Sequence, residues 1–132
     1  MSQENLGVVK GIYRAFEDGD VQAVFARFDP SVEWLAAENS PAARSRPCRG
    51  VDEVRDGVFK LIAEEFPGLA MSVNEWLDAG ERIVVLGIYA GERKVTGKRF
   101  RAQFAHIWTV AAGKVVRFQQ YTDTHQLAET AK

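Results

Sequence analysis

Two polar side chains stand among large apolar ones late in the sequence, where alternation predicts two strands. His106 shares a strand face with Phe104 and Trp108, and Gln120 shares the next strand's face with Phe118. Neutral imidazole can accept or donate a proton near pH 7, so His106 is the candidate general acid or base. The alternative is a core histidine satisfied by one hydrogen bond. Gln120 can orient a ligand oxygen, or it can bind His106, or both.

Other candidates follow from side-chain type and position. Trp34 and Tyr13 are either core aromatics or pocket-lining residues, and Tyr13 can lend a hydroxyl if its helix face meets a cavity. Asp123 is considered for catalysis, although an aspartate followed by Thr124 more simply caps a short helix over 126–130. The predicted catalytic residues are His106 and Asp123, and the predicted ligand-binding residues are Tyr13, Trp34, Phe104, Trp108, Phe118, Gln120 and Thr122.

Charged side chains give fewer indications. Arg44, Arg46 and Arg49 lie in one loop. They either meet an anionic ligand at the pocket mouth or lie in solvent with Arg49 in a structural role, and the second interpretation is favoured. The two histidines and the scattered carboxylates lack metal-ligand spacing, and the glycines of 91–97 do not form a phosphate-binding pattern. We therefore predict no metal and no cofactor.

The elements that position these residues are helices first and strands last. Apolar residues in the first half recur at spacings of three and four, whereas the period changes to two after Leu69. Short turns join the later strands, which predicts an antiparallel sheet and an α+β fold. The predicted elements are a helix that ends at Gly19, a second helix from Asp20 to Phe28, a strand over 32–36, a loop over 38–50, a third helix between Gly50 and Pro67, and strands over 69–78, 82–90, 99–110 and 114–122.

The last hairpin decides whether His106 and Gln120 meet. A two- or four-residue turn around Ala112-Gly113 pairs Gln120 with Ala105. A three-residue turn with a bulge at Gly113 pairs Gln120 with His106. The apolar pattern favours the second register, since a slip of one residue would move His106 to the other face.

Bulk composition limits the class of protein. The chain has 132 residues, one cysteine (Cys48) and a net charge of −1, which predicts a single domain over 1–132 without disulfides. A nucleic-acid binder needs a basic surplus that this sequence lacks. There is no signal pattern at the N-terminus and no apolar run of the roughly 20 residues that span a bilayer. We expect a cytoplasmic protein that binds neither nucleic acid nor membrane.

Several short strings, taken in order, resemble the nuclear-transport-factor-two-like superfamily, in particular its branch of SnoaL-like cyclases and ketosteroid isomerases. The matching strings are Tyr13-Arg14-Ala15-Phe16, Gly19-Asp20, Phe28-Asp29-Pro30-Ser31-Val32-Glu33-Trp34, Cys48-Arg49-Gly50, Thr96-Gly97-Lys98-Arg99-Phe100, His106-Ile107-Trp108-Thr109, Gly113-Lys114-Val115-Val116 and Tyr121-Thr122-Asp123-Thr124. The resemblance implies a cone-shaped, curved antiparallel sheet packed against three helices of the N-terminal half (a cystatin-like α+β barrel) that enclose one pocket. It also implies a dimer through the outer sheet face.

The catalytic groups of these relatives match poorly. The tyrosine and two aspartates of ketosteroid isomerases fall at Ile12, Trp34 and Ala105, so that mechanism is not expected. SnoaL-like cyclases use a histidine that matches His106 and a last-strand aspartate that matches Gln120. Limonene epoxide hydrolases also carry a carboxylate there, and an amide does not titrate.

The expected function is therefore a pocket for a hydrophobic small molecule, with proton transfer or hydrolysis resting on His106. The alternative is a non-catalytic ligand-binding or dimerisation module. The expected dimer interface includes Ile107, Val115 and Tyr121 on the outer sheet face.

Overall fold

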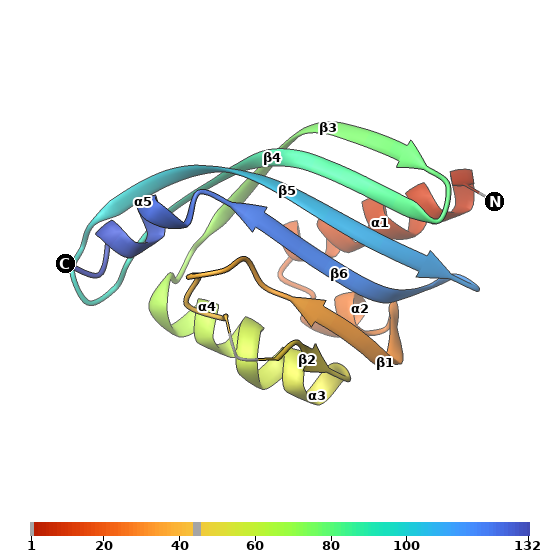
Figure 1. Cartoon of the computed structure of the whole chain (residues 1–132), viewed down its shortest axis with the longest axis horizontal. Coiled ribbons are helices and arrows are strands. Elements are labelled where there is room, and N and C mark those ends of the chain that lie inside the picture. The colour runs from red at the N-terminus through yellow and green to blue at the C-terminus, as the bar shows by residue number, and fades with distance from the viewer. Residues whose placement is uncertain (1, 44–45) are drawn as a thin grey trace.

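The computed structural model describes residues 2–43 and 46–132 and shows a curved sheet that arches over helices (Figure 1). The strands run in the order β2-β1-β6-β5-β4-β3. The predicted α+β cone is confirmed. Its elements are α1 (Ser2–Glu17), α2 (Val21–Phe25), β1 (Phe28–Leu35), β2 (Cys48–Arg49), α3 (Val51–Val54), a π-helical turn (Arg55–Phe59), α4 (Lys60–Glu65), β3 (Ala70–Ala79), β4 (Arg82–Glu92), β5 (Arg99–Ala111), β6 (Lys114–Thr122) and α5 (Thr124–Glu129).

The second helix and the first strand differ from the prediction. Helix α2 ends at Phe25 and Phe28 already belongs to β1. Pro30 is tolerated in this strand because the pairing of β1 with β6 is interrupted between Phe28 and Glu33. Strand β1 runs parallel to β6, so the sheet is not wholly antiparallel. The short strand β2 lies within the predicted loop and pairs with β1.

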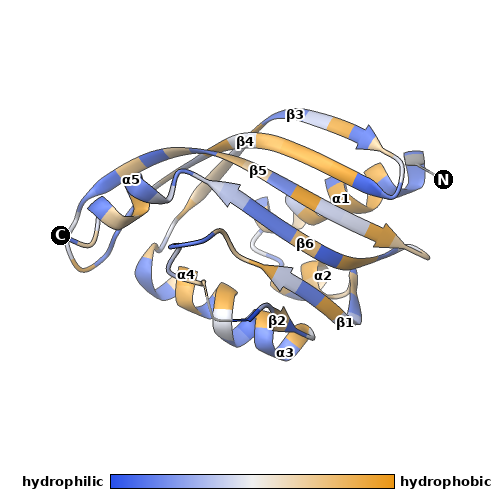
Figure 2. Cartoon of the chain, viewed as in Figure 1, coloured by the Kyte–Doolittle hydropathy of each residue, from blue (hydrophilic) through white to orange (hydrophobic). Residues whose placement is uncertain are grey.

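Alternating burial along the long strands forms the core. Residues on one face of β5 are buried from Phe100 to Val110, as predicted, and Figure 2 shows apolar segments along β4 and β5. The helices cover this face, with Val9 and Ile12 of α1 and Val54 of α3 fully buried. Helices α3 and α4 continue one another through the π-helical turn. In the described part of the chain, no helix is long and apolar enough to cross a membrane.

The hairpin between β5 and β6 has the predicted register for a different reason. His106 pairs with Gln120, but the turn has two residues, since Ala111 pairs with Lys114. The shift comes from a bulge farther along, between Thr109 and Val110. The bulge also turns Val115 into the core, where it is fully buried. The prediction that Val115 lies on the outer face is therefore wrong.

Candidate functional site

A cavity of about 700 Å³ lies between the sheet and the helices. Its walls are mainly aromatic and aliphatic side chains from α1, β1, the π-helical turn, α4 and β3 to β6. Its lining includes exposed residues from the end of α1, from α4 and from the turn after α4, namely Glu17, Ala63 and Gly68. This side of the cavity is its route to solvent.

A hydrogen-bonded network of three polar side chains forms part of the cavity wall. The hydroxyl of Tyr13 on α1 is hydrogen-bonded to Nδ1 of His106 on β5. The hydroxyl of Tyr89 on β4 is hydrogen-bonded to Nε2 of the same ring at 2.5 Å. All three residues are buried and line the cavity. Both ring nitrogens are therefore engaged, and His106 has no free lone pair to act alone as a base.

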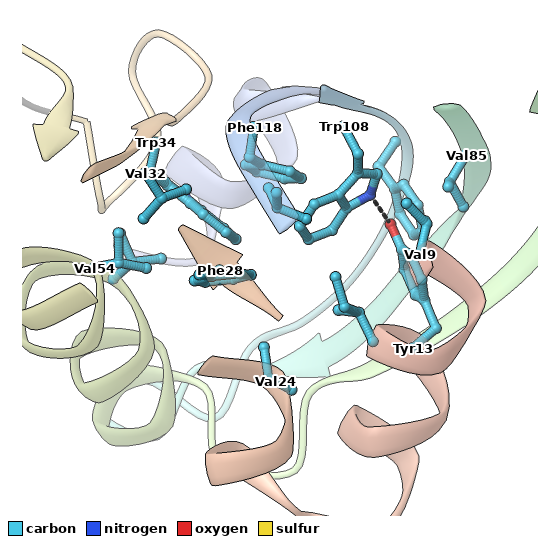
Figure 3. Packing of buried hydrophobic residues seen from close by; sticks show 14 of the residues in the cluster. Val9, Tyr13, Val24, Phe28, Val32, Trp34, Val54, Val85, Trp108 and Phe118 are labelled. Carbon is cyan, nitrogen blue, oxygen red and sulfur yellow. Dashed lines mark hydrogen bonds between the residues drawn. The ribbon is translucent and has the colours of Figure 1, made fainter. Parts of the chain in front are cut away.

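Two further side chains donate hydrogen bonds to the tyrosines at the two ends of this network. The indole N–H of Trp108 donates to the Tyr13 hydroxyl at 3.0 Å, as Figure 3 shows. The amide of Gln120 donates from Nε2 to the Tyr89 hydroxyl at 2.9 Å, while its Oε1 accepts from the backbone N–H of Ala37 at 3.0 Å. The bond from Ala37 sets the orientation of the Gln120 amide, so each tyrosine oxygen receives one permanent donor.

Burial keeps the tyrosine and histidine side chains of this network uncharged. Desolvation lowers the pKa of His106 to about 3, because the charged imidazolium would lose its hydration. Desolvation likewise raises the pKa of Tyr89, and it raises the pKa of Tyr13 well above its ordinary value. Imidazolium and tyrosinate are therefore both disfavoured at pH 7, and the wall offers neutral hydrogen-bonding groups.

The position of the His106 ring depends on a glycine in the neighbouring strand. Phe104 stacks on His106 with ring centroids 4.0 Å apart and an angle of 14° between the rings. Phe104 pairs with Gly87 of β4, where a Cβ atom would lie 2.6 Å from Cζ of Phe104. Only glycine leaves room for Phe104 to lie against the strand and support the imidazole.

Ser40 brings a second polar group to the cavity. It lies between β1 and β2, is buried and lines the cavity. Among the described residues its hydroxyl has no hydrogen-bond partner. A buried hydroxyl left unsatisfied costs about 1–3 kcal/mol, so a polar ligand atom is the natural partner for Ser40.

Most residues that the sequence singled out do come together. The cavity-lining members of the predicted set are Tyr13, Trp34, His106, Trp108, Phe118 and Gln120. Three members lie elsewhere. Phe104 packs behind His106, and Thr122 donates to the backbone carbonyl of Gln103. Asp123 caps α5 by accepting from the backbone N–H of Gln126.

The arginine loop is only partly described, since Arg44 lies outside the described residues. Arg46 forms an ion pair with Glu53 at 3.0 Å, and Arg49 pairs with Glu33 at 3.3 Å. Both arginines are exposed and neither lines the main cavity. Among the described residues, no three His, Cys, Asp or Glu side chains are grouped in a way that could hold a metal ion.

Tyr89 is a residue of the site that the sequence pattern did not single out. The alternation of β4 places Tyr89 on the buried face with Ile83 and Val85, so strand parity was the available signal. Parity does not show that the phenol reaches His106, which pairs with Val85 four residues away. The length of the tyrosine side chain spans that diagonal along the sheet.

The protein is similar to known proteins in both sequence and structure. Residues 9–118 match the family model of the SnoaL-like domain. An NTF2-like protein from Burkholderia thailandensis is 34% identical, with a TM-score of 0.91 over 96% of each chain. TerC, solved after co-crystallisation with polyporic acid, is 22% identical, with a TM-score of 0.84 over 96% of this chain and 97% of its own. A candidate SnoaL-like polyketide cyclase from Jannaschia is 18% identical, with a TM-score of 0.78 over 93% and 90%. Among proteins of curated function, none matches.

Proposed function

Because the chain belongs to the SnoaL-like domain family of the NTF2-like superfamily, we propose that its cavity binds a hydrophobic small molecule bearing at least one oxygen. The observation that carries this proposal is the neutral hydrogen-bonded network from Tyr13 through His106 to Tyr89 in an otherwise apolar wall. Such a combination of apolar surface and a few placed polar groups is typical of ligand sites.

The shape of the wall favours a ligand with rings. Trp34 and Phe118 stack with centroids 3.8 Å apart, and Trp108 lies 4.5 Å from Phe118. Flat aromatic faces of this kind pack well against flat ligands. The co-crystallisation of TerC with polyporic acid and the description of the Jannaschia protein as a candidate polyketide cyclase support this choice. The unpartnered hydroxyl of Ser40 supports an oxygen-bearing ligand.

The second part of the proposal is that the bound ligand undergoes proton transfer. Since both nitrogens of His106 are engaged, any proton would move through a tyrosine hydroxyl rather than directly to the imidazole. Among the described residues that line the cavity, Glu17 is the only carboxylate, and it is exposed. This shortage of bases favours the second candidate, a ligand-binding module without catalysis. The two candidates differ in the variant His106→Gln. Loss of turnover with ligand binding kept would support catalysis, and the absence of turnover in the native protein would support the binding module.

A direct test of binding blocks the route to solvent. We expect 1-tetralone, a neutral fused-ring ketone, to bind the native protein in isothermal titration calorimetry. Ala63 is exposed and lines the cavity, so Ala63→Trp should reduce binding at least tenfold. Glu64→Trp is the matched control, because Glu64 is exposed on the same helix but does not line the cavity. Equal affinity in both variants would overturn the assignment of this cavity as the ligand site.

We also propose a homodimer through the outer sheet face and a cytoplasmic location. The side chains of Ile107 and Leu86 remain half-buried on that face, and Tyr121 is 55% exposed. A second copy would cover these groups. The buried free thiol of Cys48 is compatible with a reducing compartment.

A further inference from the structure

The tyrosine and histidine side chains hold one more proton than their mutual hydrogen bonds use. Neutral Tyr13, His106 and Tyr89 carry three labile protons, one on each side chain. Two hydrogen bonds join them, one at each ring nitrogen of His106. One hydroxyl proton is therefore always left over, and it belongs to a tyrosine that lines the cavity.

The tautomer of His106 decides which tyrosine carries that proton. With the proton on Nδ1, His106 donates to Tyr13, and Tyr89 donates to Nε2. Tyr13 then accepts two bonds, one from His106 and one from the Trp108 indole, and its own proton is free. With the proton on Nε2, the roles reverse, because Tyr89 accepts from His106 and from Gln120.

The other tyrosine always keeps one free lone pair. It donates to His106 and accepts a single permanent bond, from Trp108 or from Gln120, although a hydroxyl oxygen can accept two. The wall thus presents one donor and one acceptor at any moment, at two points separated by an imidazole ring and two hydrogen bonds. Transfer of the proton between the two ring nitrogens exchanges the two points.

We propose that this site selects a neutral hydroxy-ketone, with the hydroxyl and the carbonyl at opposite ends of a rigid apolar ring system, and that His106 adopts the tautomer that matches the bound orientation. The carbonyl accepts from the tyrosine that has the free proton, and the ligand hydroxyl donates to the other tyrosine. This inference rests on the proposed function, since it names the class of ligand for the same cavity.

The test compares three ligands on the unaltered protein by isothermal titration calorimetry. The probe 6-hydroxy-1-tetralone has a donor and an acceptor at opposite ends, 6-methyl-1-tetralone is its size-matched analogue without the donor, and 1-tetralone has the acceptor alone. We expect the hydroxy-ketone to bind about tenfold more tightly than the other two, as for one added hydrogen bond in a dry site.

Two single substitutions test the exchange of roles. Because either tyrosine can supply the donor, Tyr13→Phe and Tyr89→Phe should change the affinity for 1-tetralone to the same extent, within about threefold of each other. Each should also remove the tenfold advantage of the hydroxy-ketone. In nitrogen NMR of the native protein, His106 should change from a mixture of tautomers to a single one when the hydroxy-ketone binds.

The outcomes separate this inference from the proposed function. Equal affinity of the native protein for all three ketones would overturn the donor and acceptor pairing alone. Loss of 1-tetralone binding in only one of the tyrosine variants would show a fixed donor and would also overturn it. If no ketone binds, the proposed function fails for this ligand class, and the inference fails with it.

Discussion

The burial of neutral His106 should make the stability of the protein depend on pH. In the folded chain its pKa is lowered to about 3, whereas an unfolded histidine has a pKa of about 6.5. Between these values the unfolded state binds a proton that the folded state does not. The free energy of unfolding is therefore largest above pH 6.5, and it falls as the pH decreases from 6.5 toward 3.

The size of this effect follows from the two pKa values. Each pH unit well inside the window costs about 1.4 kcal/mol, so lowering the pH from 8 to 5 should reduce the free energy of unfolding by about 2 kcal/mol. The range above pH 5 is chosen because ordinary carboxylates titrate mainly below it. The other histidine of the sequence is His125, whose side chain is 80% exposed.

Urea denaturation between pH 8 and pH 5 would measure the effect. His106→Gln should lower the free energy of unfolding at pH 8, because the tyrosine contacts are perturbed, but it should remove most of the pH dependence. His125→Gln is the matched control and should keep the native dependence. A native slope that survives in His106→Gln would refute the conclusion that a buried, neutral His106 controls acid stability.

Five other substitutions test separate features. Gly87→Ala should destabilise the fold by about 1–3 kcal/mol in urea denaturation through overpacking, whereas Gly7→Ala, with open space around its exposed helical position, should stabilise it by about 0.5–1 kcal/mol; equal effects would contradict the packing argument. Asp123→Ala should cost about 1 kcal/mol of stability and leave ketone binding unchanged, and a loss of binding would restore Asp123 as a site residue. Ile107→Glu should dissociate the proposed dimer in sedimentation analysis, a result that a monomeric native protein would exclude. Ser40→Ala should leave the stability unchanged or raise it, because the Ser40 hydroxyl has no partner in the described structure, and a clear loss would reveal a hidden bond.

The strands and their faces could be predicted because alternation is a local property of the sequence. The burial of His106 between Phe104 and Trp108 follows from their shared parity on β5. The contact of His106 with Gln120 was also predicted, but its cause was not. The sequence indicated a bulge at Gly113, whereas the structure has it near Val110. Two different turns can give one register, so a correct pairing does not establish the local geometry.

The features that the sequence did not reveal depend on contacts between distant segments. The parallel pairing of β1 with β6 joins Phe28 to Val115, and no local pattern distinguishes it from an antiparallel pairing. Pro30 suggested that a helix ended there, whereas it lies within a strand at a gap in the pairing. The contact of Tyr89 with His106 was missed for the same reason, since it runs diagonally across two strands.

The missing carboxylates and the buried histidine lead to a single conclusion about the ligand. At two cavity positions that match titrating groups of the relatives, this chain has Trp34 and Gln120. A neutral Gln120 costs less to bury beside Tyr89 than a carboxylate would, and it donates where a carboxylate could only accept. That donation leaves the hydroxyl of Tyr89 free to face either the ligand or His106. The substitutions that remove the relatives' chemistry therefore produce a wall of uncharged groups, and such a wall favours a neutral ligand over an anion.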